Sequence, residues 1–75
     1  MRIPKATTIR KNIHSYARKV GFSIIVNPDN SYNLWDVVMG YCIHRGVNMD
    51  TIVRVVIDDM YAKKYREENS LTVGG

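Results

Sequence analysis

The residues with the chemistry of catalysis or metal binding are few in this sequence and poorly spaced. Cys42, the single cysteine, lies two positions before His44, and His14 is the other of the two histidines. A closed zinc site needs four ligands, which this set does not supply. Residues two positions apart on a helix also point in different directions, which disfavours a cysteine–histidine nucleophile pair. We therefore expect no metal and no cofactor, and interpret Cys42 as a small core residue.

The adjacent carboxylates Asp58 and Asp59 are the other candidates for catalysis. Paired catalytic carboxylates need a cleft that raises the pKa of one of them, whereas these two fall on the polar half of an amphipathic segment. Gly40 and Gly46 lack the spacing of a phosphate-binding loop. The sequence therefore predicts a protein that is not an enzyme.

Positive charge is concentrated at the start of the chain. The net charge is +4, and residues 1–20 carry six cationic side chains and no acidic one. The periodicity predicts a helix over residues 8–20 with a basic face and an opposite apolar face. The basic face consists of Arg10, Lys11, His14 and Arg18.

This basic face suits phosphate groups, whether those of nucleic acid or of anionic lipid. A solvated face that keeps the protein soluble is the plain alternative. The apolar side of the same helix lacks Trp, Phe and Leu, so we favour packing on protein over a position on a membrane surface.

Length and composition indicate one globular domain. The chain has 75 residues, of which 45% are hydrophobic and 24% charged, and one cysteine excludes an internal disulfide. No apolar run reaches the roughly 18–20 residues of a membrane span, and no signal peptide opens the chain, so we expect a cytoplasmic protein. The predicted domain covers residues 1–68 and consists of a basic helical extension (1–21) and a ribbon-like core (22–68). Residues 69–75 are expected to form a flexible tail after it.

Residues 22–27 alternate in the manner of a strand. One face is formed by Phe22, Ile24 and Val26, and the other by Ser23, Ile25 and Asn27. No second strand is evident in the sequence, and a single strand leaves its backbone groups without partners. We therefore expect the partner strand to come from a second copy of the chain.

Two helices are expected after a break at residues 28–31. The first, over residues 33–45, is apolar on most sides, and a chain of this length has little material to cover it. Gly46 ends it, and Asn48 caps a second helix that runs to residue 67. The predicted fold is mainly α with one short β-strand, in the order helix–strand–helix–helix.

The succession of strand, break, helix, Gly-x-Asn turn and helix resembles the ribbon-helix-helix DNA-binding family. The matching residues are Ser23-Ile24-Ile25-Val26-Asn27 and, further on, Gly46-Val47-Asn48-Met49-Asp50-Thr51-Ile52-Val53. The resemblance covers about residues 22–65. It implies an intertwined homodimer, in which two paired strands form a ribbon that enters the DNA major groove.

The resemblance also implies roles for single residues. The base-reading side chains would be Ser23, Ile25 and Asn27. The phosphate contact at the start of the second helix would come from Asn48. The helix ahead of the strand departs from the family pattern, and we expect its Arg10, Lys11, His14 and Arg18 to add phosphate contacts beside the ribbon. The dimer core would contain Phe22, Ile24, Val26, Trp35, Val38, Ile52 and Val56.

Two functions follow as hypotheses. The first is a dimeric, sequence-specific DNA-binding protein that acts as a transcriptional repressor, with double-stranded DNA and a second copy as partners and no membrane. The alternative is a small non-enzymatic interaction module, an inhibitor or adaptor from a phage or other mobile element, that docks on a partner protein. The apolar Ile25 on the outward face of the strand favours this alternative.

Overall fold

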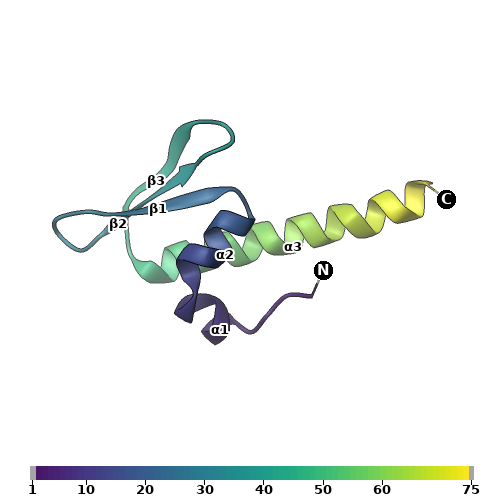
Figure 1. Cartoon of the computed structure of the whole chain (residues 1–75), viewed down its shortest axis with the longest axis horizontal. Helices are drawn as coiled ribbons and strands as arrows, with labels where there is room; N and C mark the ends of the chain where they lie inside the picture. Colours follow the sequence, from purple (N-terminus) through teal and green to yellow (C-terminus); the bar gives the residue numbers. More distant parts are fainter. Residues whose placement is uncertain (1, 75) are drawn as a thin grey trace.

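Helices and strands succeed one another in the order α-α-β-β-β-α in the computed structural model, which describes residues 2–74 and the side chains of residues 2–68. The elements are α1 (Ala6–Lys11), α2 (Ile13–Lys19), β1 (Phe22–Val26), β2 (Tyr32–Asp36), β3 (Tyr41–Val47) and α3 (Met49–Gly74). The strands form an antiparallel sheet in the order β1-β2-β3. Figure 1 shows the sheet beside the first half of α3, while the second half of this helix extends away from it.

This architecture corrects the predicted fold, which was mainly helical with one strand. The segment 33–45, expected to be a helix, forms most of β2 and β3 and the turn between them. Leu34 on β2 pairs with Ile24 on β1, and Trp35 pairs with Cys42 on β3. The segment is rich in β-branched and aromatic residues, which favour strands. A run that is apolar at most positions fits either a buried helix or a hairpin.

The strand at residues 22–27 is confirmed as β1, but its partner belongs to the same chain. Every residue of β1 pairs with a residue of β2, from Phe22 with Asp36 to Val26 with Tyr32. β1 therefore finds the partner strand that it requires within its own chain, while its other edge pairs with no strand among the described residues. The intertwined ribbon-helix-helix homodimer was inferred from that requirement, and it is wrong for this fold.

The break at residues 28–31 is the turn between β1 and β2. Asn27 N–H donates to the carbonyl oxygen of Ser31 over 2.8 Å. Asp29 Oδ1 accepts hydrogen bonds from both the hydroxyl and the N–H of Ser31. These two bonds, the one from the hydroxyl first, lower the pKa of the Asp29 carboxyl. Asn33 Oδ1 accepts from Asn27 Nδ2 and from the Gly46 N–H, each over 2.9 Å. One amide oxygen on β2 thus links the ends of all three strands.

The single helix expected over residues 8–20 is two short helices. Asn12 separates them with φ −122° and ψ 37°, outside the helical region. Its N–H and its side-chain amide both lie 3.3 Å from the carbonyl oxygen of Thr8. Asparagine competes with helical hydrogen bonding in this way, which accounts for the break.

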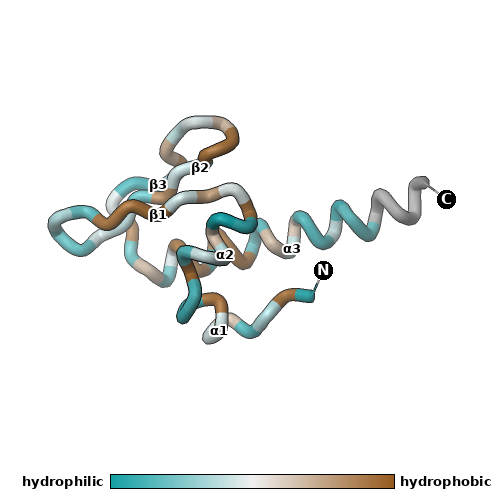
Figure 2. Tube along the Cα trace, viewed as in Figure 1, coloured by the Kyte–Doolittle hydropathy of each residue, from teal (hydrophilic) through white to brown (hydrophobic). Residues whose placement is uncertain are grey.

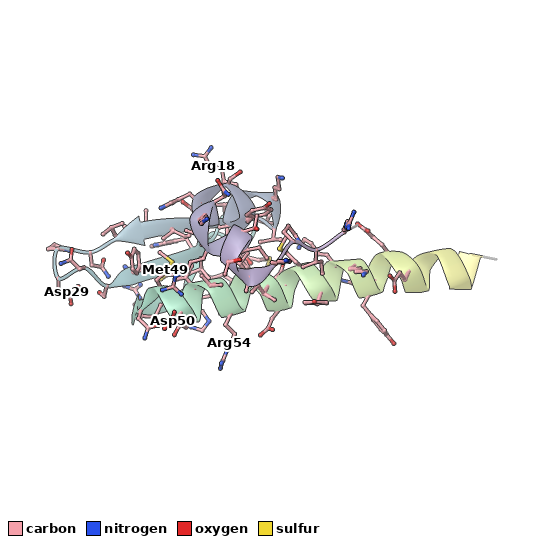
Figure 3. The ribbon with its side chains drawn as sticks, turned by 90° about the horizontal axis from the view of Figure 1, so that it is seen from below. Arg18, Asp29, Met49, Asp50 and Arg54 are labelled. Atoms are coloured by element: carbon pink, nitrogen blue, oxygen red, sulfur yellow. The ribbon has the colours of Figure 1, made fainter. Side chains whose placement is uncertain are left out.

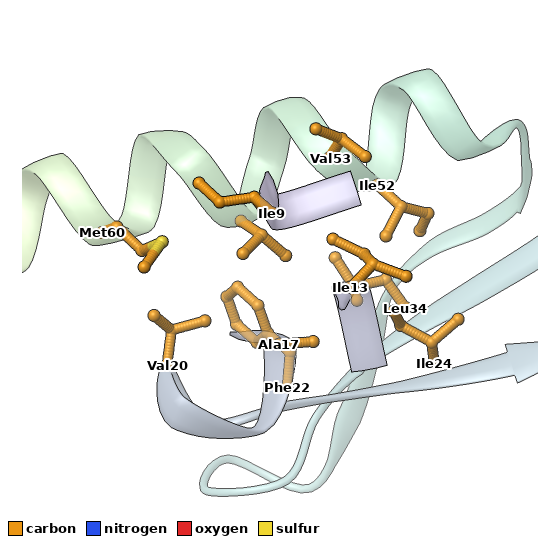
Figure 4. Packing of buried hydrophobic residues seen from close by; sticks show 11 residues of the cluster. Ile9, Ile13, Ala17, Val20, Phe22, Ile24, Leu34, Ile52, Val53 and Met60 are labelled. Atoms are coloured by element: carbon orange, nitrogen blue, oxygen red, sulfur yellow. The ribbon is translucent and has the colours of Figure 1, made fainter. Parts of the chain in front are cut away.

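The core forms where α1, α2 and α3 meet the first two strands (Figure 4). Every buried residue among those described is apolar. The core side chains are Ile9, Ile13, Ala17, Val20, Phe22, Ile24, Leu34, Ile52, Val53, Val56 and Met60. The predicted basic extension therefore supplies core residues as well as charge.

The predicted cap of the last helix is confirmed. Asn48 Oδ1 accepts from the Thr51 N–H over 2.9 Å, which satisfies one of the free donors at the start of α3. The helix continues to Gly74, past the predicted end at residue 67. The side chains of the predicted tail, residues 69–75, lie outside the described residues, and its flexibility stays a prediction.

Replacing Gly21 with alanine is expected to destabilise the protein by about 1–2 kcal/mol. Gly21 has φ +88°, which costs other residues energy, and an added Cβ would lie 3.3 Å from Val38 Cγ2. Urea unfolding followed by circular dichroism would measure the change. Gly40→Ala is a matched control, because Gly40 has φ +78° with open space around it and so isolates the backbone cost.

Candidate nucleic-acid interface

The basic face expected from the sequence is exposed on α1 and α2. These two helices turn Ile9, Ile13 and Ala17 into the core, and their other positions are exposed apart from the half-buried Tyr16. We use the name cationic face for the exposed side chains of Lys5, Arg10, Lys11, Arg18 and Lys19; His14 is exposed on α2 as well and counts as neutral at pH 7. Because α1 and α2 are separate helices, these side chains are spread over two elements rather than along the stripe of one helix.

Most of the cationic face has no negative partner within the described residues. Arg10 Nη1 forms an ion pair with Asp50 Oδ1 at the start of α3, and both side chains are more than half exposed. Lys19 Nζ lies 5.0 Å from the ring centroid of Tyr16. Exposed ion pairs contribute only about 0–1 kcal/mol, so an incoming anion displaces Asp50 at little cost. The cationic face is therefore available to phosphate groups.

The labelled arginines show how charge is distributed around the molecule. Arg18 projects from one side and Arg54 of α3 from the opposite side (Figure 3). Asp50 and Arg54 line a hollow between α1 and α3, together with Arg10 and Asp58. The hollow carries both signs of charge, and it shares Arg10 with the cationic face.

The three predicted base readers share one face of β1, as the alternation predicts. Ile25 on this face is 47% exposed, and Ser23 is half-buried. The Asn27 amide is engaged internally, because Nδ2 donates to Ser31 Oγ and Asn33 Oδ1. Base reading by these residues stays a prediction, and it no longer follows from the fold, because β1 has its partner strand in its own chain.

Residues assigned to a dimer core separate into two groups. Four of them are buried within one chain: Phe22, Ile24, Ile52 and Val56. The other three are not: Val26 and Val38 are exposed, and Trp35 is half-buried on the sheet. The single chain thus uses part of the expected interface as its own core.

Asn48 was expected to hold a phosphate at the start of the last helix. Its side chain is instead the cap of α3, with Oδ1 accepting from the N–H and the hydroxyl of Thr51. Asp50 adds negative charge to the same helical turn. The phosphate contact at Asn48 stays a prediction, and we do not include it in the cationic face.

Cys42 and His44 lie on β3 rather than on the expected helix, so the helical geometry that was held against this pair does not apply. Cys42 Sγ donates to the carbonyl oxygen of His44 over 3.1 Å rather than to the imidazole. Among the described side chains, no group of three or more His, Cys, Asp or Glu residues could hold a metal ion. Cys42 is half-buried on β3, outside the main core.

The turn between β2 and β3 is a feature that the sequence reasoning missed. Its side chains are apolar and exposed, with Val38 at 81% and Met39 at 69%. Figure 2 shows hydrophobic residues at this turn. We use the name apolar turn for Val37, Val38 and Met39. Asp36 before it and Gly40 after it are turn formers, and they were the signals that could have located it.

Comparison of the chain with protein-family models, with curated proteins and with solved structures finds no match. None of the described helices has the length and hydropathy needed to cross a membrane.

Proposed function

We propose that this chain is a small non-enzymatic protein that binds double-stranded DNA through its phosphate backbone. One observation carries the proposal: the lysine and arginine side chains on and next to α1 and α2 are exposed, and among the described residues only Arg10 of this set is paired with a carboxylate. Lysine and arginine in such an arrangement release counterions from DNA when they bind phosphates, which supplies affinity without reading sequence. The proposed place of action is the cytoplasm.

Sequence-specific repression of transcription is not part of this proposal. It depended on a ribbon shared between two chains, and β1 pairs with β2 of its own chain instead. Repression stays a prediction from the resemblance, without support from the fold. The proposal therefore expects similar affinity for duplexes of unrelated sequence.

Salt dependence is the test of this proposal. If the cationic face contacts four or five phosphates, a plot of log K against log salt concentration has a slope of about −4. Fluorescence anisotropy with labelled duplexes of two unrelated sequences would measure it. Absence of binding at low salt, or affinity that does not change with salt, would contradict the proposal.

Docking on a partner protein is a second candidate, favoured by a different observation. Tyr61 and Tyr65 are exposed on the part of α3 that extends away from the sheet, at positions that share one helix face. Tyrosine is enriched at protein interfaces. A stoichiometric partner recovered after nuclease treatment, and lost from Tyr61→Ser/Tyr65→Ser, would support this candidate over DNA binding.

A further inference from the structure

The apolar turn is held in one conformation by its own hydrogen bonds. Asp36 Oδ1 accepts from the Val38 N–H over 3.0 Å and from the Met39 N–H over 2.9 Å. Gly40 N–H donates to the carbonyl oxygen of Asp36 over 2.8 Å, and Gly40 has φ +78°. The N–H groups of three successive turn residues are thus satisfied. The turn can leave water without stranding these donors, which an irregular loop could not do.

The side chains of the apolar turn are unusually exposed for apolar residues. Its three side chains are between 60% and 81% exposed although all are large and apolar. Isolated exposed apolar residues are ordinary, but three in succession at the tip of a hairpin form a patch of the kind that marks a binding site. The two-stranded hairpin presents these three side chains as a narrow projection rather than as a flat surface.

The apolar turn is anchored next to the end of the cationic face. Val37 N–H donates to the carbonyl oxygen of Gly21 over 3.0 Å, and Gly21 N–H donates to that of Arg18. Gly21 follows Val20, the C-cap of α2, and the last turn of α2 carries Arg18 and Lys19. In Figure 1 the turn lies at the end of the sheet where α2 leads into β1. The basic end of α2 is therefore close to an apolar projection.

We propose that the apolar turn is a wedge that enters the minor groove of bound DNA and separates neighbouring base pairs. This inference rests on the proposed DNA binding, and it adds that the duplex is deformed at the site where the apolar turn inserts. Proteins that kink DNA combine cationic contacts to the backbone with inserted apolar side chains such as methionine. Arg18 and Lys19 close α2 shortly before Gly21, which is hydrogen-bonded to the turn, so phosphate contacts and an inserted wedge would act on the same stretch of DNA. The turn is a narrow projection rather than a broad apolar helix face, which suits insertion between base pairs better than burial in a membrane surface.

Bending of the duplex is the direct test. A duplex of about 25 base pairs with a donor and an acceptor dye at its ends reports bending by energy transfer. The wild-type chain is expected to bend it by about 20–90°. Val38→Ser/Met39→Ser is expected to abolish the bend and weaken binding about tenfold, with the slope against salt unchanged because the phosphate contacts remain.

The matched control removes apolar surface elsewhere. Tyr61→Ser/Tyr65→Ser takes exposed side chains from the far part of α3 and is expected to bend DNA as the wild type does. Both sites are exposed, so the variants are expected to keep the wild-type circular dichroism spectrum. A single Val38→Ser variant provides a second, milder form of the same test.

The possible results separate the wedge from the proposed function. Salt-dependent binding without bending, or equal bending by Val38→Ser/Met39→Ser, overturns the wedge and leaves phosphate binding in place. Failure of the wild type to bind DNA overturns both. Flotation with vesicles of phosphatidylcholine and phosphatidylserine tests the membrane: vesicle binding that Val38→Ser/Met39→Ser loses would assign the turn to lipid and reject the wedge.

Discussion

Charge reversal at Lys11 and Arg18 is expected to weaken binding to duplex DNA about 100-fold at about 0.1 M salt, and to reduce the slope against salt by about 2. Both side chains are exposed, one on each of the two basic helices, and neither has a carboxylate partner among the described residues. Lys11→Glu/Arg18→Glu therefore removes two phosphate contacts and replaces them with repulsion. Anisotropy titrations at several salt concentrations would measure both quantities.

An equal change of net charge elsewhere is the necessary control. Lys64→Glu/Arg66→Glu alters the part of α3 that extends away from the sheet. Because screening weakens interactions between separated charges at this ionic strength, and this part of α3 extends away from the sheet, we expect less than about a threefold loss of affinity. If both double variants weaken binding to the same extent, the affinity reflects net charge alone and the cationic face has no special role.

The parts of the fold that were predicted correctly are those with an unambiguous local signal. Residues 22–26 form a short run rich in aromatic and β-branched residues between Gly21 and the break at residues 28–31, which is typical of a strand, and β1 occupies them. Asn48 stands immediately before an amphipathic run, and it caps α3. The cations of residues 5–19 are exposed because the helical periodicity places them opposite Ile9, Ile13 and Ala17. In each case a few neighbouring residues contain the whole signal.

The hairpin of β2 and β3 could not be recognised in the same way. Its strands are apolar on both faces in the sequence, so neither a period of two nor of 3.6 stands out. Leu34 is buried by the core, Trp35 is half-buried on the opposite face, and Val38 projects into solvent. The different burial of these three side chains follows from how β2 pairs with β1 and packs on α3. Such tertiary contacts cannot be read from the local sequence. The apolar turn was hidden for the same reason, since it exists only once the hairpin forms.

Replacing Leu34 with alanine is expected to destabilise the protein by about 2–5 kcal/mol. Leu34 lies on the central strand, paired with Ile24, and none of its surface is exposed. The cavity left by truncation borders side chains from β1 and α3, and a domain of this size has only a few kcal/mol of stability to lose. Thermal unfolding followed by circular dichroism is expected to show a melting temperature lower by at least about 10 °C.

Val38→Ala turns this measurement into a test of the hairpin itself. In the helix that the sequence suggested, Leu34 and Val38 are one turn apart on the same apolar face, and truncating either would carry a similar penalty. In the hairpin, Val38 is 81% exposed at the turn, so its truncation is expected to change stability by less than about 0.5 kcal/mol. Comparable losses of stability in the two variants would favour a buried helix over β2 and β3. A large loss for Leu34→Ala alone is the result that the three-stranded sheet requires, because only in that arrangement do these two neighbouring aliphatic residues occupy opposite environments.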